Sequence, residues 1–338
     1  MALASVRGPI SGPLYAEEWF VHVTAVVVAY NRCDLLAEAL RALALQTRLV
    51  DSIVVVDNAS SDGSAEVARS VAPTADVISL SRNTGGAGGF AIGIERAATR
   101  HSADLVWIMD DDTIPSPKAL SHLLAARAQH AGTPAVVASK VIWTDGTEHP
   151  MNTPRRKPLA RRREAQAALA VGCIPVRSAS FVSLLVDIDS VRKHGLPLAA
   201  YFIWNDDFEF TGRLLRRGIG LFCPQSVVLH KTRVLGSTDV DPGPRFFYEV
   251  RNKLWLFRRS TALSATEKTV YIGASVVRWS RTFIRSSDRA TLRTAFRSGW
   301  RDGWRSNPVP NATALSDLAG VGAAVAKFEA AVAAGRTR

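Results

Sequence analysis

The feature that most constrains this sequence is an apolar run that ends in three consecutive aspartates. Residues 105–109 are suited to a buried strand, Asp110, Asp111 and Asp112 follow directly, and two prolines soon stop the strand from continuing. Adjacent carboxylates repel one another, so a buried strand end holds three of them at low cost only when a cation shares the site. The stretch therefore predicts a divalent metal site. The alternative is an acidic N-cap and turn before a helix over residues 118–130.

Strand-like and helix-like segments alternate through the first third of the chain. We expect strands over residues 22–30, 52–57, 75–80 and 104–109, with helices over 35–45, 65–72 and 85–100 between them. Further strands are expected over 135–143, 180–187 and 219–229, a helix over 211–217, and mainly helix from 246 onward. This alternation is typical of a parallel, right-handed α/β sheet, in which ligands bind outside the carboxyl ends of the strands.

A chain of 338 residues with 47% hydrophobic content can bury one large or two moderate cores. We expect a leader over residues 1–20, a catalytic domain over 21–257 and a helical region over 258–338. The net charge of +12 favours an anionic partner, which could be a nucleic acid, a membrane surface or a phosphorylated substrate. Motifs that stack nucleic-acid bases are absent, which disfavours the first of these.

The cysteines and the N-terminus bear on cellular location. Three widely spaced cysteines without paired metal-binding spacing are expected to be reduced thiols of a cytoplasmic protein. No basic segment followed by an apolar one resembles a signal peptide, and no apolar run approaches about 18 residues. We therefore expect neither secretion nor a membrane span.

Two loops at strand ends carry groups that suit a nucleotide. Asp57, Asn58 and Asp62 follow the second strand, where their side chains could bond a base and a ribose. The turn after the first strand, formed by Ala29, Tyr30, Asn31 and Arg32, could reach the same base. Both loops could equally be ordinary helix caps.

A glycine-rich loop follows the third strand. It contains Arg82, Asn83, Gly85, Gly86, Gly88 and Gly89. Glycines let a backbone approach a ligand closely, and their amides together with an arginine suit a diphosphate. The spacing also fits the dinucleotide fingerprint, but that fingerprint belongs after the first strand and needs a single downstream acid, not three.

A second acidic cluster comprises Trp204, Asn205, Asp206, Asp207 and Glu209. Apolar walls raise the pKa of a carboxylate and make it a better proton acceptor, although acids at a helix start would also suit the helix dipole. His230 ends a strand and could add a nitrogen ligand to a metal held by oxygens. Basic runs at 155–157 and 161–163 are typical of a mobile, solvated loop, with capture of an anionic substrate as the alternative.

These motifs stand in the order found in family 2 glycosyltransferases of the GT-A fold, over about residues 23–257. They are Ala29-Tyr30-Asn31, the run from Val56 to Gly63, the run from Arg82 to Gly86, Asp110-Asp111-Asp112, the run from Trp204 to Glu209, and His230. The residue order in the glycine-rich loop and in the aspartate stretch resembles that of actinobacterial galactofuranosyltransferases that build cell-wall galactan. The length of the chain resembles the initiating enzyme among them.

The resemblance implies a fold and a reaction. The fold is GT-A, a Rossmann-like, mostly parallel sheet with helices on both faces, followed by a mainly helical C-terminal region. The reaction is a metal-dependent, inverting transfer of galactofuranose from UDP-galactofuranose to a polyprenyl-diphosphate-linked glycan. A dTDP-rhamnose-dependent rhamnosyltransferase, a nicotinamide oxidoreductase and a noncatalytic nucleotide-sugar-binding protein are the alternatives.

The resemblance also implies roles for individual residues. Mn²⁺ or Mg²⁺ would be held by Asp110, Asp112 and His230. The UDP-sugar would contact Ala29, Tyr30, Asn31, Arg32, Asp57, Asn58, Asp62, Arg82, Asn83, Gly85, Gly86, Gly88, Gly89, Asp110 and Asp111. The acceptor would contact Trp204, Asp206, Glu209, Arg251 and Asn252, with Tyr248 in the same helical motif near the diphosphate.

Two of these roles need qualification. Asp207 would be the catalytic base, with Asp206 as the second candidate because Asn205 separates Trp204 from the acidic pair. If strand alternation persists, Asp111 points away from its neighbours and fixes the loop or contacts the sugar.

Arginines recur every four residues near the C-terminus, at Arg285, Arg289, Arg293, Arg297, Arg301 and Arg305. Beside them runs an apolar stripe of Leu292, Phe296, Trp300 and Trp304, while Gly299 and Gly303 weaken the helix slightly. A basic face beside an aromatic one suits an anionic membrane surface, and packing on the catalytic domain is the alternative. With a lipid-linked acceptor, the membrane interpretation predicts a peripheral protein on the inner face of the plasma membrane.

Overall fold

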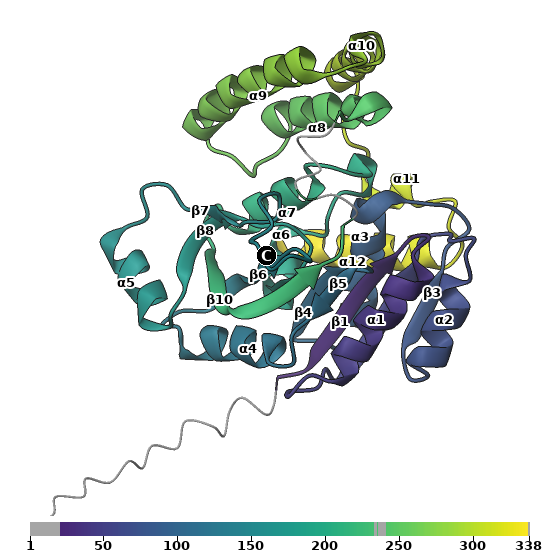
Figure 1. Cartoon of the computed structure of the whole chain (residues 1–338), viewed down its shortest axis with the longest axis vertical. Helices are drawn as coiled ribbons and strands as arrows, with labels where there is room; N and C mark the ends of the chain where they lie inside the picture. Colours follow the sequence, from purple (N-terminus) through teal and green to yellow (C-terminus); the bar gives the residue numbers. More distant parts are fainter. Residues whose placement is uncertain (1–20, 233–234, 236–240, 337–338) are drawn as a thin grey trace, which may run out of the picture.

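The alternation predicted for the first third of the chain is present (Figure 1). The computed structural model describes residues 21–232, 235 and 241–336, so the expected leader over 1–20 lies outside the described residues. The elements here are β1 (Val23–Ala29), α1 (Cys33–Ala44), β2 (Ser52–Asp57), α2 (Ser64–Val71), β3 (Asp76–Ser79), α3 (Gly85–Thr99) and β4 (Leu105–Asp110).

The middle of the chain extends the sheet beyond β4. Its elements are β5 (Thr113–Pro115), α4 (Ala119–Gln129), β6 (Pro134–Ile142), β7 (Arg155–Arg156), α5 (Arg162–Ala170), β8 (Ile174–Ser178), β9 (Leu184–Asp187), α6 (Ile188–His194), α7 (Asp206–Leu214) and β10 (Ile219–His230). The strand order is β3-β2-β1-β4-β9-β6-β10-β8-β7, with β5 paired to β10. Strands β1 to β4 pair in parallel, whereas β9 runs antiparallel to both β4 and β6. The predicted mostly parallel α/β sheet is confirmed, with antiparallel strands in its second half.

Period-two alternation in β1 decides which helices cover each face of the sheet. Ala25 and Val27 join the apolar core beneath α1 and α4, whereas Val26 and Val28 face α3 and α12. A Cβ atom on Gly89 of α3 would collide with the Val28 side chain, so this glycine allows the helix to approach the sheet closely. The helix and the strand are thereby fixed relative to each other next to the carboxyl end of β1.

Several boundaries differ from those expected. The helix expected over 211–217 begins at Asp206, because Asn205 adopts a left-handed conformation that turns the chain into the helix. The basic run at 161–163 leads into α5, where alanines sustain a helix in a segment expected to be a loop. Strand β8 precedes the expected strand over 180–187, of which only β9 is extended. It brings Cys173 beside Cys223, whose pKa a hydrogen bond from Cys173 lowers to about 7.

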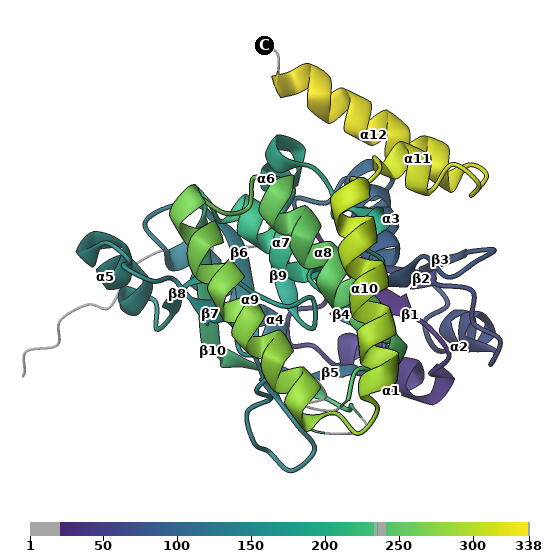
Figure 2. The same cartoon turned by 90° about the horizontal axis from the view of Figure 1, so that it is seen from above.

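The mainly helical C-terminal region is confirmed, and it divides into two parts (Figures 1 and 2). The helices are α8 (Phe246–Arg258), α9 (Ala265–Arg285), α10 (Arg289–Arg305), α11 (Asn311–Ala314) and α12 (Val321–Arg336). Helices α8 to α10 form a layer above the sheet domain, with a small core that includes Val250 and Trp279. Val325 and Phe328 of α12 instead join the main core. None of the described helices combines the length and the apolar character needed to cross a bilayer.

Candidate active site

The aspartate stretch meets His230 because β5 pairs with the end of β10. Thr113 lies opposite His230 in this antiparallel pair, and the Lys231 amide donates to the Asp112 carbonyl oxygen at 2.9 Å. Ligand atoms of Asp110, Asp112 and His230 consequently lie within 4.8 Å of one another. The alternative of an acidic N-cap is wrong, because β5 intervenes before α4, whose N-cap is Lys118.

A hydrogen bond orients the imidazole of His230 toward the acids. Its Nδ1 donates to Asn152 Oδ1 at 3.0 Å, while the Asn152 amide nitrogen donates to Ser180 Oγ at 3.3 Å. A neutral imidazole that donates through Nδ1 presents a lone pair at Nε2. That nitrogen lies 3.1 Å from Asp112 Oδ1, a buried oxygen without a hydrogen-bond donor. A carboxylate oxygen and an imidazole nitrogen at this distance can both bind one cation. These ligand atoms suit Mn²⁺ or Mg²⁺.

The acids of this cluster differ in their electrostatic surroundings. Burial and the charge of Asp112 raise the pKa of Asp110 to about 6. Burial opposes ionisation of Asp112 as well, but His230, when its Nε2 carries a proton in place of a metal, and Arg32 hold its pKa below the ordinary value. Arg32 bonds both Asp112 and Asp111, so it balances part of the negative charge.

Asp111 lies in the turn just after β4, where strand alternation no longer applies, and it bonds the loop after β1. Its carboxylate accepts a hydrogen bond from the Tyr30 amide at 2.8 Å, and burial raises its pKa to about 7. Asp111 therefore fixes the turn after β1, which is one of the two roles expected for it.

The two loops predicted to bind the nucleotide are tied together. Asn31 accepts from the Ser61 amide at 2.8 Å, and the Cys33 amide donates to Asp62 at 2.9 Å. Asp57, buried beside them, accepts from the Ser60 amide. The Tyr30 side chain stays 46% exposed and is free to cover a ring. The loops thus form a rigid edge at the carboxyl ends of β1 and β2.

The glycine-rich loop is packed into its surroundings at most positions. Asn58 accepts from the Thr84 amide and donates to the Gly85 carbonyl oxygen. Gly85 has a φ of +71° and lies against the Phe202 backbone, where any side chain would collide. Gly88, Gly89 and the Asn83 side chain also serve contacts within the chain. Gly86 faces Asp206 instead, with no atom closer than 3.7 Å to where its Cβ would stand.

Arg82 has partners outside the loop. Its guanidinium pairs with Asp317, 2.5 Å away, and also donates to the Ala314 carbonyl oxygen. The structure thus connects Arg82 to the segment between α11 and α12, and the predicted contact of Arg82 with the donor stays a prediction.

The second acidic cluster stands at the end of a strained loop. Phe202, Trp204 and Asn205 all have φ angles of 64–66°, a region that costs non-glycine residues about 1 kcal/mol or more each. The loop delivers Asp206 and Asp207 to the first turn of α7. Such strain persists only where surrounding contacts enforce it.

The carboxylates of α7 share the electrostatic field of the metal cluster. Burial and the charge of Asp207 raise the pKa of Asp206 well above its ordinary value, with a contribution from Asp110. Burial also raises the pKa of Asp207, which Arg155 and Lys253 oppose. Asp206 is buried and Asp207 half-buried, so Asp207 is the more accessible of the two.

Two of the residues predicted to contact the acceptor, Asn252 and Arg251, support the strained loop through hydrogen bonds to its backbone. The Asn252 amide is fully buried and donates to the carbonyl oxygens of Tyr201, Ile203 and Trp204. Arg251 donates to the Ala200 and Tyr201 carbonyl oxygens. These contacts lie beneath the loop, where a bound acceptor would not reach Asn252 without rearrangement.

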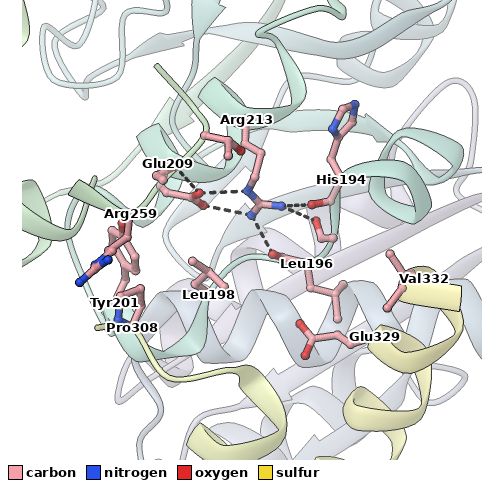
Figure 3. Close-up of a pocket in the computed structure, with 14 residues that line it drawn as sticks. His194, Leu196, Leu198, Tyr201, Glu209, Arg213, Arg259, Pro308, Glu329 and Val332 are labelled. Atoms are coloured by element: carbon pink, nitrogen blue, oxygen red, sulfur yellow. Dashed lines mark hydrogen bonds and ion pairs between the residues drawn. The ribbon is translucent and has the colours of Figure 1, made fainter. Parts of the chain in front are cut away.

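Glu209 belongs to a different cavity (Figure 3). It pairs with Arg213 at 3.0 Å and accepts from Ser260 Oγ at 2.8 Å. The cavity, of about 310 Å³, is also lined by Leu198 and Val332. The structure therefore does not bring Glu209 to the metal cluster, although it keeps Trp204 and Asp206 beside the strained loop.

Sequence reasoning missed Asn152 and Lys253 as site residues. The sequence gives no pattern that marks either residue, because Asn152 is a single asparagine in a loop and Lys253 is a single lysine in a helix. Lys253 is nevertheless only 5% exposed, and its Nζ lies 5.1 Å from the centre of the Phe208 ring. Arg155, flagged by its basic run, lies 5.0 Å from the same ring.

Known proteins resemble this chain in sequence and in fold. Residues 24–188 match the model of the family described as Glycosyl transferase family 2. The chain is 33% identical over 243 residues to Galactofuranosyltransferase GlfT1 of Mycobacterium tuberculosis, covering 67% of this chain and 79% of the relative.

Among solved structures, S. aureus TarS 1-349 in complex with UDP aligns with a TM-score of 0.58 and 14% identity, covering 94% of this chain and 89% of that one. GalNAc-T7 with UDP, GalNAc and Mn²⁺ aligns with a TM-score of 0.55 and 15% identity, covering 90% of this chain and 58% of that one. At these identities the likeness concerns the fold alone.

Proposed function

Because the chain belongs to glycosyl transferase family 2 and has the GT-A fold, we propose that it transfers galactofuranose from UDP-galactofuranose to a polyprenyl-diphosphate-linked glycan of cell-wall galactan. The observation that carries this proposal is the meeting of Asp110, Asp112 and His230 beside Asp207 in a chain 33% identical to a galactofuranosyltransferase. Family membership makes the protein a glycosyltransferase, so the nicotinamide oxidoreductase alternative is dropped.

The donor end of the reaction rests on the first two loops and the metal cluster. Asp110, Asp112 and His230 would hold Mn²⁺ or Mg²⁺, which neutralises the charge that grows on the departing UDP. Tyr30 would cover the uracil, with Asp57 at the edge of the base. The UDP found in the TarS structure and the UDP and Mn²⁺ found in the GalNAc-T7 structure support this assignment.

The acceptor end rests on α7. Asp207 takes the proton of the acceptor hydroxyl as its oxygen bonds to the anomeric carbon, while the bond from that carbon to UDP breaks on the opposite face. This single displacement inverts the anomeric centre. Asp207 is preferred to Asp206 as the base because it is half-buried, whereas Asp206 is buried.

Transfer assays with purified protein test both ends of the proposal. With UDP-galactofuranose, Mn²⁺ and a polyprenyl-diphosphate-linked glycan acceptor, Asp207→Asn is expected to lower turnover by about 10²–10⁴-fold while UDP binding by calorimetry stays unchanged. Asp112→Asn is expected to lose both. Robust turnover by the Asp207 variant would reject the base.

The choice of donor has its own outcomes. Transfer from dTDP-rhamnose instead of UDP-galactofuranose would support the rhamnosyltransferase alternative. Binding of UDP-galactofuranose without transfer or donor hydrolysis would support a noncatalytic sensor.

The proposal extends to location, on the cytoplasmic surface of an anionic membrane. Val270, Val277 and Ile284 recur every seven residues along α9 and are at least half exposed. The arginines of α10 are exposed, and so are Trp300 and Trp304 at 42% and 50%. Packing accounts for the buried Leu292 and the half-buried Phe296 but leaves this outer face uncovered. Apolar and basic groups side by side suit an anionic bilayer.

A further inference from the structure

A buried lysine lies beside the proposed base without a counter-ion. Lys253, in α8, has its ammonium group against the Phe208 ring, and Phe208 directly follows Asp207. No carboxylate of the described residues lies within ion-pair distance of Lys253. The carboxylates of Glu249 and Asp207 act on its charge only through space.

A second cation lies against the same ring as this lysine, and a third acts on the lysine through its charge. Arg155 reaches from β7 onto the same Phe208 ring, and its guanidinium also lies 5.8 Å from the Tyr271 ring. Arg278 comes from α9. Burial, with the charges of Arg155 and Arg278 acting in the same direction, lowers the pKa of Lys253 to about 8. We call Arg155, Lys253 and Arg278 the cationic cluster.

Two other cations that are mostly buried among the described residues are paired with carboxylates. Arg177 and Arg213, each mostly buried, make two-pronged ion pairs with Glu267 and Glu209. A buried ammonium group that faces two arginines and no bound carboxylate is unfavourable unless an anion arrives from outside. The contrast indicates that the cationic cluster is built for a ligand.

The position of the cluster limits what that ligand is. It draws on the sheet domain through Arg155 and on the helical layer through Lys253 and Arg278, so it lies at the seam between them (Figures 1 and 2). Phe208, the ring that Lys253 and Arg155 share, directly follows Asp207, so the cluster adjoins the proposed base. The cationic cluster has no residue in common with Asp110, Asp112 and His230, which would hold the metal of the donor diphosphate.

We propose that Arg155, Lys253 and Arg278 form a subsite for the diphosphate of the lipid-linked acceptor. Arginine forks and a lysine point charge together match the several oxygens of a diphosphate. The Phe208 and Tyr271 rings, 5.1 Å apart in an edge contact, offer an apolar wall to the first isoprene unit. The acceptor identity rests on the proposed function, whereas the anion subsite itself does not.

Calorimetry with farnesyl diphosphate as the probe tests the subsite without requiring transfer. UDP and Mg²⁺ are kept saturating so that the donor site is filled. The wild type is expected to bind the probe, and Lys253→Met and Arg155→Gln to bind it on the order of tenfold more weakly. Arg156→Gln, an exposed neighbour on the same strand, is the matched control and is expected to bind like the wild type. Equal binding by all four proteins would overturn the proposal.

Two further probes identify the source of the anion. Farnesol is expected to bind weakly and equally to all the proteins. Inorganic pyrophosphate is expected to bind more weakly than farnesyl diphosphate, because it lacks the apolar chain. Equal affinity for these two diphosphates would reject the lipid and leave a free phosphate site.

Kinetics separates a subsite from a merely structural role. Arg155→Gln, at an exposed position, is expected to raise KM for a diphosphate-linked acceptor about tenfold while leaving the KM for UDP-galactofuranose unchanged. With a neutral alkyl glycoside carrying the same sugars, the variant and the wild type are expected to have equal KM values. An equal rise with both acceptors would contradict the subsite. If no transfer occurs with any acceptor, the proposed function fails while the binding measurements still judge the subsite.

Discussion

The buried contact between Asn152 and His230 controls which imidazole nitrogen faces the aspartates. Removing it frees the ring to turn and to adopt the other tautomer. We expect Asn152→Ala to weaken Mn²⁺ binding by about 10–100-fold, as loss of such supporting hydrogen bonds commonly does. Calorimetry or electron paramagnetic resonance of Mn²⁺ would measure the change. Thr153→Ala, at an exposed position in the same loop, should bind Mn²⁺ normally, and equal affinity in both variants would contradict the role of Asn152.

The same residues mark how far sequence alone could locate the site. Asp110 and Asp112 were predictable because a buried strand ends in them, and His230 because it ends another strand of the same sheet. Asn152 was not, because its contact with His230 spans 78 residues and follows no spacing rule. Lys253 could not be predicted for a similar reason, because its burial depends on how the helical layer packs on the sheet domain.

At the scale of elements, α10 and α8 touch through glycines that the sequence marks only as weak helix formers. A Cβ on Gly299 would stand 2.5 Å from the Phe247 carbonyl oxygen, which is backbone and cannot move aside. We expect Gly299→Ala to lower the free energy of unfolding by about 1–2 kcal/mol, because overpacking exceeds the gain in helix propensity. Gly273→Ala in α9 is the matched control. Nothing lies within 4 Å of its Cβ position, so urea unfolding should report a gain of up to about 1 kcal/mol.

The start of α9 is fastened to β8 by an ion pair. Arg177 donates to both oxygens of Glu267, which also caps the helix with Ser264. Burial opposes ionisation, but bonds from Arg177 and Ser264 lower the pKa of Glu267 from 4.5 to about 2. Because the folded pKa is the lower one, the ion pair stabilises the protein above pH 4.5, and this stabilisation is lost as the pH falls toward 2.

The size of this contribution makes it measurable. A pKa lowered from 4.5 to about 2 corresponds to about 3 kcal/mol at neutral pH. Urea unfolding should therefore find Glu267→Gln less stable than the wild type by up to that amount at pH 7, with the difference shrinking below pH 4.5. Glu38→Gln removes an exposed pair with Lys231 and should change stability by less than about 1 kcal/mol. A difference that does not depend on pH would assign the effect to packing.

Helices and strands were predicted correctly where the periodicity of their own residues was sufficient. They were predicted incorrectly where a strand forms only by pairing with a distant part of the chain. The strand β1 could be recognised from its own apolar residues, and α1 could be recognised from its apolar face. The strand β7 has two residues and exists only because β8 lies beside it, so a basic run reads as a loop. The cap predicted as the alternative for the aspartates failed likewise, because β5 needs β10 as its partner.

At the scale of the whole molecule, the sheet domain carries the metal cluster and the helical layer carries Lys253. The chain passes from β10 into α8 to α10 and then returns through α12 to the face of the sheet beside α3. Arg82 joins this return to the glycine-rich loop through Asp317. The helical layer is therefore held at both ends, which keeps the seam that contains Lys253 in register with Asp207.

The outer face of that layer, formed by α9 and α10, points away from the sheet domain (Figure 1). If it docks on anionic lipid, flotation with phosphatidylglycerol vesicles should recover the wild type, and phosphatidylcholine vesicles should not. Changing Arg289, Arg293 and Arg297 to Glu should abolish flotation, since each arginine near an anionic surface contributes about 1 kcal/mol. Val277→Asp should weaken it by removing an exposed apolar contact.

A second triple variant, in α5, controls for the change in net charge. Arg161, Arg162 and Arg163, at the start of α5, are exposed, and α5 lies beside the sheet and not in the layer of α8 to α10 (Figure 1). Changing all three to Glu alters the net charge by the same amount as the α10 variant, so it should leave flotation intact if docking is local. Equal loss in both triple variants would mean that net charge alone drives binding. Equal flotation of the α10 variant and the wild type would mean that this face does not meet the membrane, and the acceptor lipid would then have to reach Lys253 and Arg278 by another side of α9.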